Sequence, residues 1–161
     1  MKRLVVSALA AVAALVATPA PAAADGTAFL GLSPTSNARS ASGAALGFKF
    51  IFLDFEFEYA HMTEGLASNT PGFSSGMFNI ALETPTKTKI YLTAGGGLTH
   101  ENLGAATRWG VGTDIGGGVK LPLAGPIRLR LDYRVFTLHN GIPSAPNKMQ
   151  YRFYAGLNVA F

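Results

Sequence analysis

The stretch Gly116–Leu138, GGGVKLPLAGPIRLRLDYRVFTL, contains two alternating segments on either side of one tight turn. From Ile127 to Val135 every second residue is large and apolar, and the residues between them are Arg128, Arg130, Asp132 and Arg134. A period of two predicts a β-strand, because successive side chains of a strand point to opposite faces. One face of this strand is charged and the other is apolar, so the two faces must meet different surroundings.

The same alternation recurs along the chain and predicts eight strands: Thr27–Ser33, Gly43–Phe50, Asp54–Ala60, Gly76–Glu83, Lys89–Thr99, Trp109–Lys120, Ile127–Leu138 and Gln150–Phe161. Longer loops are predicted after every odd-numbered strand, at 34–42, 61–75, 100–108 and 139–149. The other connections are short turns, including LPLAGP at 121–126. This order is typical of an antiparallel up-and-down meander with all the long loops at one end. The parity of the first strand stays open, because either Phe29 or the residues beside it could face the apolar side.

The N-terminus predicts an export signal. Lys2 and Arg3 precede the apolar run LVVSALAAVAALVA, and two prolines and a group of alanines ending at Ala24 follow it. This is the order of a secretory signal peptide and its cleavage site. Residues 1–24 are therefore predicted to be removed, with cleavage near Ala24, and residues 25–161 to form one domain. An uncleaved anchor is the alternative, although the apolar run is shorter than the ~20 residues that a spanning helix needs.

Composition excludes several classes of protein. Basic residues number 13 against 9 acidic ones, but two of the basic residues lie in the predicted signal and no basic run occurs, so no nucleic-acid partner is predicted. The absence of cysteine excludes a disulfide scaffold, a thiolate metal site and a cysteine nucleophile. The glycine runs lie inside predicted strands with no helix after them, unlike a nucleotide-binding loop. Because no helix-length apolar run follows residue 24, the exported chain could enter a membrane only as a closed barrel.

The polar face of the predicted sheet carries nearly balanced charges among glycines and alanines. Its charged residues are Asp54, Glu56, Glu58, Glu83, Asp114, Asp132, Lys49, Lys89, Lys120, Arg128, Arg130, Arg134 and Arg152. Opposite charges beside small residues suit a narrow barrel interior that is filled with paired side chains and has no wide pore. The acids of the Asp54–Ala60 strand are expected to pair with Arg128, Arg130 and Arg134, so Arg130→Met alone should destabilise the barrel.

The apolar face is continuous on all the predicted strands, with aromatic residues towards the strand ends. Tyr59, Trp109, Tyr133 and Tyr151 are assigned to the loop end, and Phe50, Phe55 and Phe161 to the turn end. Aromatic girdles at two membrane interfaces have this arrangement. A secreted, soluble β-sandwich that acts as a binding module is the alternative, because its strands alternate in the same way and its charged face would be hydrated.

The segments GGGVKLPLAGPIRLRLDYRVF (116–136) and YRFYAGLNVAF (151–161) resemble the small eight-stranded outer-membrane β-barrel family, the OmpA-like and opacity-type barrels. The resemblance implies an all-β, eight-stranded transmembrane barrel in the outer membrane of a Gram-negative cell envelope, with no catalytic residues, cofactor or metal. Phe161 would be the terminal residue that the outer-membrane assembly machinery reads. The expected partners are that machinery, outer-membrane lipid and lipopolysaccharide. The barrel is expected to be a monomer with a structural or surface-interaction role through its extracellular loops.

The three histidines, His61, His100 and His139, stand just after odd-numbered predicted strands and hence at the loop rim. Three imidazoles could bind zinc. The alternation, however, puts all three on the outward face, splayed around a barrel, so no metal site is predicted. The acidic residues of the Asp54–Ala60 strand could form an acid/base pair for hydrolysis, but their inward parity favours pairing with the arginines.

A lipid A deacylase is the enzyme alternative, since that family also has eight strands, with its nucleophile and base outside the barrel. His139 and the following Asn140 faintly resemble the family's His-x-Ser-Asn region. Gly141 occupies the position of the family's serine, although Ser144 lies near it. Without a hydroxyl there, His139 has nothing to activate. The prediction is therefore a non-enzymatic protein.

Overall fold

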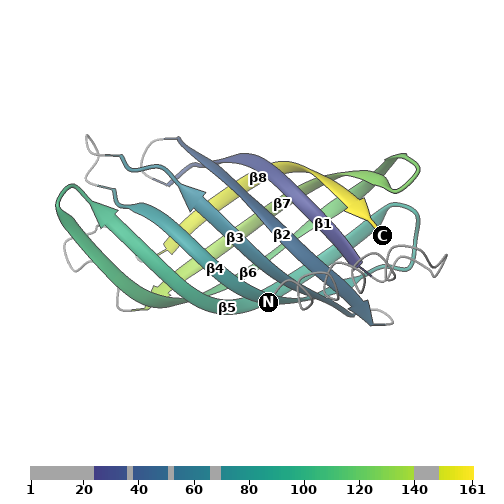
Figure 1. Cartoon of the computed structure of the whole chain (residues 1–161), viewed down its shortest axis with the longest axis horizontal. Helices are drawn as coiled ribbons and strands as arrows, with labels where there is room; N and C mark the ends of the chain where they lie inside the picture. The colour runs from purple at the N-terminus through teal and green to yellow at the C-terminus, as the bar shows by residue number, and fades with distance from the viewer. Residues whose placement is uncertain (1–23, 36–37, 51–52, 66–69, 140–148) are drawn as a thin grey trace, which may run out of the picture.

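The computed structural model of the chain is one closed barrel of antiparallel strands (Figure 1). It describes residues 24–35, 38–50, 53–65, 70–139 and 149–161. The strands are β1 (Ala24–Ser33), β2 (Arg39–Phe50), β3 (Leu53–Met62), β4 (Gly72–Glu83), β5 (Lys89–Leu103), β6 (Ala106–Ala124), β7 (Ile127–His139) and β8 (Met149–Ala160). Each strand pairs with its neighbours in chain order, and β1 pairs with β8. The predicted all-β, eight-stranded up-and-down barrel is confirmed.

The two chain ends of the barrel domain meet at one end of the barrel. The backbone N–H of Phe161 donates to the carbonyl of Ala24 at 2.9 Å, and the N–H of Ala24 donates back at 3.1 Å. Strands β2, β4 and β6 end at this terminus end, and the odd-numbered strands β1, β3, β5 and β7 end at the opposite, loop end (Figure 1). No helix in the described part of the chain is long and apolar enough to cross a membrane. The predicted signal peptide lies outside the described residues apart from Ala24, and its cleavage stays a prediction.

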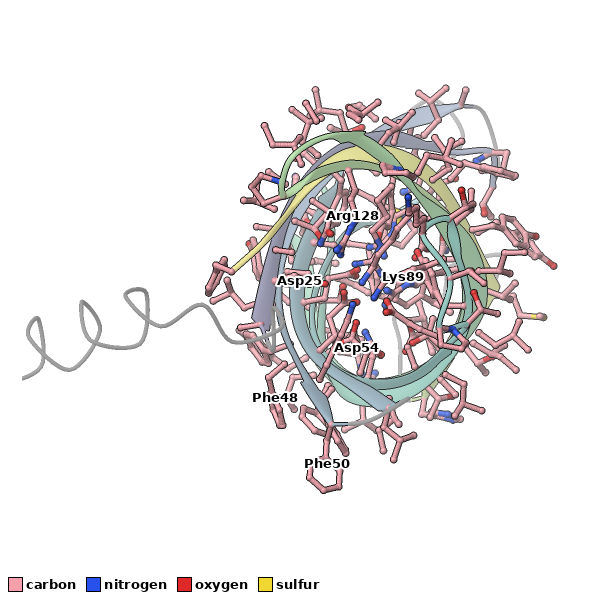
Figure 2. All side chains as sticks on the ribbon, turned by 90° about the vertical axis from the view of Figure 1, so that its right-hand side faces the viewer. Asp25, Phe48, Phe50, Asp54, Lys89 and Arg128 are labelled. Carbon is pink, nitrogen blue, oxygen red and sulfur yellow. The ribbon has the colours of Figure 1, made fainter. Side chains whose placement is uncertain are left out.

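Alternation sorts the side chains of each strand into an interior and an exterior set. In β3 the carboxylates of Glu56 and Glu58 are buried, whereas Phe57 and Tyr59 are more than half exposed. Figure 2 looks into the terminus end and shows nitrogen- and oxygen-bearing side chains inside the ring, with Phe48 and Phe50 outside it. The apolar surface therefore covers the outside of the barrel, and most of the polar surface faces inward.

The parity of β1, which the sequence leaves open, is settled by its pairing with two strands at once. Asp25, Thr27 and Phe29 are buried in the interior, and Leu30 and Leu32 are exposed. The ring of Phe29 stacks on that of Tyr154 with centroids 4.0 Å apart. Strand β1 therefore contributes one carboxylate and one large aromatic ring to the interior.

Three of the predicted loops are shorter than the sequence suggests. The predicted loop 100–108 is wrong, because the pairing of β5 with β6 continues to Leu103 and Ala106. A two-residue turn joins these strands, and Gly104 there has φ 57°, which glycine adopts without a Cβ penalty. Strand β2 already starts at Arg39, inside the predicted loop 34–42, and the predicted loop 61–75 shrinks to the residues between Met62 and Gly72.

The predicted turn LPLAGP is also shorter than expected. Strand β6 continues to Ala124, and the turn consists of Gly125, with φ 53°, and Pro126. A register shift between Pro122 and Ala124 marks a bulge in the β6–β7 pairing. A bulge tolerates Pro122, which has no N–H to donate to the ladder.

One aromatic residue does not lie where it was predicted. Tyr133, assigned to the loop end, lies in the middle of β7 and pairs with Gly117 and Phe153. Its ring packs against those of Phe153 and Tyr151 on the outer face, with ring centres 4.7 and 6.5 Å away. Tyr133 is therefore part of the middle of the apolar surface and not of an end girdle.

Candidate functional site

The interior at the terminus end holds a cluster of acids and lysines. Carboxylate oxygens of Asp25, Asp54 and Glu83 lie within 4.8 Å of one another. The amine of Lys120 lies 3.0 Å from Asp25, 3.1 Å from Asp54 and 2.6 Å from Glu83. The amines of Lys49 and Lys89 lie 2.6 and 3.3 Å from Glu83. The lysine of β6 thus occupies the space between the three carboxylates and neutralises a group that would otherwise repel itself.

The middle of the interior is organised around Arg130 and Asp132. Arg130 is ion-paired with Glu56 and lies 3.2 Å from Asp132, and its Nε donates to the hydroxyl of Tyr91 at 2.8 Å. The hydroxyls of Tyr91 and Tyr154 both donate to Asp132, the second at 3.1 Å. All these groups are buried. Each charge therefore has the partners that burial requires, because an unpartnered buried charge is strongly destabilising.

Arg134 lies on the loop-end side of this group and contacts four carboxylates from three strands. Its guanidinium lies 2.7 Å from Glu56, 3.3 Å from Glu58, and 3.1 Å from both Asp114 and Asp132. Glycines of β6 leave room for it: a Cβ at Gly116 would stand 2.8 Å from the Arg134 side chain. The glycine run therefore makes space inside the barrel for long charged side chains.

Arg152 is held by aromatic rings as well as by an acid. Its Nη2 lies 2.6 Å from Glu58. Its guanidinium carbon lies 4.9 Å from the ring centres of Phe29 and Phe136 and 5.1 Å from that of Tyr154. These distances are within the range of cation–π attraction, so the rings stabilise the parts of the guanidinium that the single carboxylate does not contact.

The structure brings nine of the ten charged residues of the predicted network into these groups. The tenth, Arg128, belongs to none of them. No carboxylate among the described residues lies within ion-pair distance of Arg128, so the predicted pairing with the acids of β3 is not found for it. Among the described residues, Asp54 contacts Lys120 and no arginine. Sequence reasoning missed Asp25, because it lies before the predicted strand Thr27–Ser33, whose parity the sequence leaves open.

An apolar layer closes the interior towards the loop end. It consists of the buried side chains Ala41, Met62, Phe73, Met77, Phe136 and Leu138. The rings of Phe73 and Phe136 meet edge to face, with centroids 5.6 Å apart. The prediction of an entirely polar interior was incomplete, although Phe136 and Leu138 continue the inward parity of the β7 arginines.

Arg39 lies on the loop-end side of the apolar layer and hydrogen-bonds residues from several segments there. It donates to the carbonyls of Pro71 at 2.6 Å and Thr63 at 3.1 Å, to Gln150 Oε1 at 2.6 Å and to Ser33 Oγ at 3.4 Å. The side chain is buried. Arg39 was assigned to a loop in the sequence, and only the pairing of β1 with β2 and β8 shows that it points inward.

The three histidines lie on the outer face at the loop end, separated from one another by intervening strands. His61 Nδ1 lies 2.9 Å from Ser74 Oγ, and His139 Nε2 lies 3.3 Å from Thr113 Oγ1. The ring of His100 packs against that of Trp109 at 4.6 Å. The one group of potential metal ligands that converges among the described residues is the acid cluster around Lys120, and it contains no histidine. Gly141 and Ser144, relevant to a deacylase, lie outside the described residues.

Comparison with solved structures places this barrel among known folds. No family model matches the chain, and no curated protein matches it. The N-terminal β-barrel domain of OprF from Pseudomonas aeruginosa is similar, with TM-score 0.68 and 12% identity, over 86% of this chain and 96% of that one. Neisserial surface protein A has TM-score 0.68 and 18% identity, over 86% and 96%. The outer membrane enzyme PagL has TM-score 0.52 and 17% identity, over 85% and 99%. At these identities the likeness concerns the fold, and the chain has the fold of the small eight-stranded outer-membrane β-barrels.

Proposed function

We propose that this chain is a non-enzymatic protein of the bacterial outer membrane, with a structural or surface-interaction role carried by the connections at its loop end. The barrel would span the membrane with its termini in the periplasm. Its partners would be outer-membrane lipid, lipopolysaccharide and, during export, the assembly machinery.

One observation carries this proposal: the apolar exterior encloses an interior that is filled along its length. Charged residues fill the terminus end and the middle, and the apolar layer and Arg39 close the loop end. Hydrocarbon is the surrounding that such an exterior requires. Because described side chains occupy the interior in this way, the exterior and the loop end are the surfaces that this proposal assigns to function.

Membrane fractionation combined with gel migration tests the proposal. The protein should appear in the outer-membrane fraction, and unboiled samples should migrate differently from boiled ones, because a closed barrel resists unfolding in detergent. Planar bilayers should show no large, stable channels. A soluble mature protein would refute the membrane barrel, and large channels would refute the filled interior.

A hydrolase that acts on lipid A is the second candidate. It is supported by the likeness to the outer membrane enzyme PagL and by His139, which lies on the outer face at the loop end. If the chain were such an enzyme, its expression would remove acyl chains from lipid A, and His139→Ala would abolish the loss. The non-enzymatic proposal requires unchanged lipid A in both strains, as measured by mass spectrometry of the extracted lipid.

A further inference from the structure

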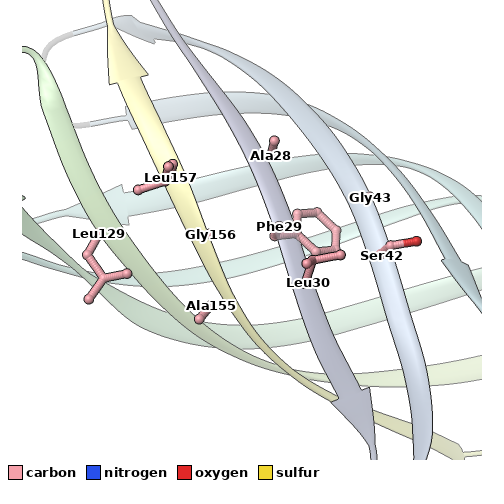
Figure 3. A pocket seen from close by; sticks show the side chains of 9 residues that line it. All are labelled: Ala28, Phe29, Leu30, Ser42, Gly43, Leu129, Ala155, Gly156 and Leu157. Carbon is pink, nitrogen blue, oxygen red and sulfur yellow. The ribbon is translucent and has the colours of Figure 1, made fainter.

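The outer face of the barrel is hollowed across β8, β1 and β2. One hollow of about 550 Å³ has Ala28 and Ala155 in its floor (Figure 3). A second, of about 620 Å³, adjoins it through Ala28 and Leu157 and reaches Ala44 and Tyr59. The two share these residues and form one groove in the apolar surface.

The strand register explains why the surface is hollow here. Ala28 pairs with Ala44 on one side and with Leu157 on the other. Leu46 and Leu157, on either side of this floor, are 65% and 56% exposed and form its walls. Small side chains on adjacent strands therefore form a floor between larger ones. The atoms that line this depression lack van der Waals partners on one side until another molecule fills it.

The two ends of the groove differ in polarity. Towards the loop end Ser42 lines the groove and pairs with His61, which in turn hydrogen-bonds Ser74 at 2.9 Å. Towards the terminus end stand stacked Phe48 and Phe55, with ring centres 5.0 Å apart. A molecule in the groove would have its polar part at the loop end and its apolar part towards the middle of the membrane.

We propose that the groove binds one acyl chain of an outer-leaflet glycolipid, whose sugar headgroup lies beside Ser42, His61 and Ser74. This inference rests on the proposed location in the outer membrane. The lipids of the leaflet at the loop end have their headgroups at this rim, and the outward-facing described residues of β1–β4 there carry hydroxyls and an imidazole but no Lys or Arg. Hydroxyl and imidazole groups of this kind can hydrogen-bond the hydroxyls and amides of an acylated sugar.

A second copy of the chain fits the groove less well. A two-fold symmetric dimer brings the same patch of both subunits together, so hollow would face hollow and the depression would stay unfilled. A flexible acyl chain can follow the floor between Leu46 and Leu157. The shape of the surface therefore favours a lipid over a symmetric dimer.

Native mass spectrometry of the refolded protein in octyl glucoside micelles tests the inference. The micelles receive equal amounts of purified lipid A or dilauroyl phosphatidylethanolamine. The wild-type protein should retain one lipid A molecule and little phosphatidylethanolamine. Ala28→Leu and Ala44→Leu, which fill the floor from outside, should each lower lipid A retention about tenfold, the effect of losing roughly two methylene groups of contact.

Ala94→Leu is the matched control, because Ala94 also faces outward but pairs with the large residues Ile80 and Ile115. It should retain lipid A like the wild type. Ala155→Leu replaces either test variant if that variant does not fold.

Equal retention of both lipids, or wild-type retention in both groove variants, would overturn the inference. A dimer peak that the groove variants remove would overturn it in favour of a second copy. Migration of the unboiled protein separates the two proposals: a folded barrel that retains no lipid A contradicts the groove alone, whereas a chain that never migrates as a folded barrel contradicts the membrane protein itself.

Discussion

Replacing Arg134 by methionine removes a cation that contacts four carboxylates and leaves a side chain of similar shape. Three of these carboxylates keep a second cation, because Glu56 and Asp132 also contact Arg130 and Glu58 contacts Arg152. Asp114, whose side chain is 0% exposed, keeps none among the described residues. Removing one partner of a buried ion pair typically costs about 3–5 kcal/mol. Arg134→Met should lower the free energy of unfolding by about that amount.

The source of this loss can be located with a second substitution. In the Arg134→Met background, Asp114→Asn removes the unpaired charge and should restore at least about 1 kcal/mol, since directly contacting residues couple by that order. Lys89→Met is the control. The Lys89 side chain is 21% exposed, and its partner Glu83 keeps Lys120 at 2.6 Å, so the change should cost less than about 1 kcal/mol.

Urea unfolding of the barrel in phospholipid vesicles measures these differences. The single tryptophan, Trp109, is 70% exposed on the outer face, so its fluorescence should shift as it moves from lipid to water. Unboiled gel migration gives an independent measure of the folded fraction. Unfolding of Arg134→Met at the wild-type urea concentration, or strict additivity of its effect with that of Asp114→Asn, would refute the assignment of Asp114 as the orphaned charge.

Three further predictions concern backbone space, the loop end and assembly. Gly95→Ala should destabilise the barrel by about 1–3 kcal/mol in the same urea assay, because the added Cβ would stand 2.4 Å from a backbone oxygen of β4. Gly26→Ala is the control and should change the stability little, because the nearest atom to its added Cβ lies at 3.5 Å. Arg39→Met should cost about 1–3 kcal/mol by leaving the buried carbonyl of Pro71 unpaired, while exposed Arg108→Met should unfold like the wild type; equal stabilities would contradict the anchoring role of Arg39. Phe161→Ala, which keeps the backbone bonds to the first strand, should reduce the amount of folded protein in cell outer membranes but not refolding in vesicles, and a normal cellular yield would argue against Phe161 as the assembly signal.

Most of the fold could be predicted from the sequence, because the alternation in segments such as Asp54–Ala60 and Ile127–Leu138 is strict over many residues. The strand ends could not. Arg39 and Leu103 lie beside turn-forming residues, and only pairing with the neighbouring strands keeps them extended. The bulge at Pro122 likewise depends on β7, which supplies the ladder that Pro122 interrupts.

Less of the interior charge network and of the outer groove could be predicted. The arginines and acids of the interior carry inward parity in the sequence, but which carboxylate meets which cation depends on the stagger between strands far apart in the chain. Glu56 and Arg130 are an example, and Asp54 with Lys120 is another. The outer groove depends on Ala28 lying beside Leu157, and only closure of the barrel brings these two residues together.

The apolar layer inside the loop end lies apart from the connections that the proposed surface role would use. Its members, such as Met62, Phe73 and Phe136, belong to strands and not to the connections beyond them. In the proposed membrane location, the barrier against solute leakage would therefore lie below the connections that face the outside of the cell. Under that proposal, sequence drift, insertion or grafting of foreign epitopes beyond the strand ends would alter what the cell displays without opening a leak through the barrel.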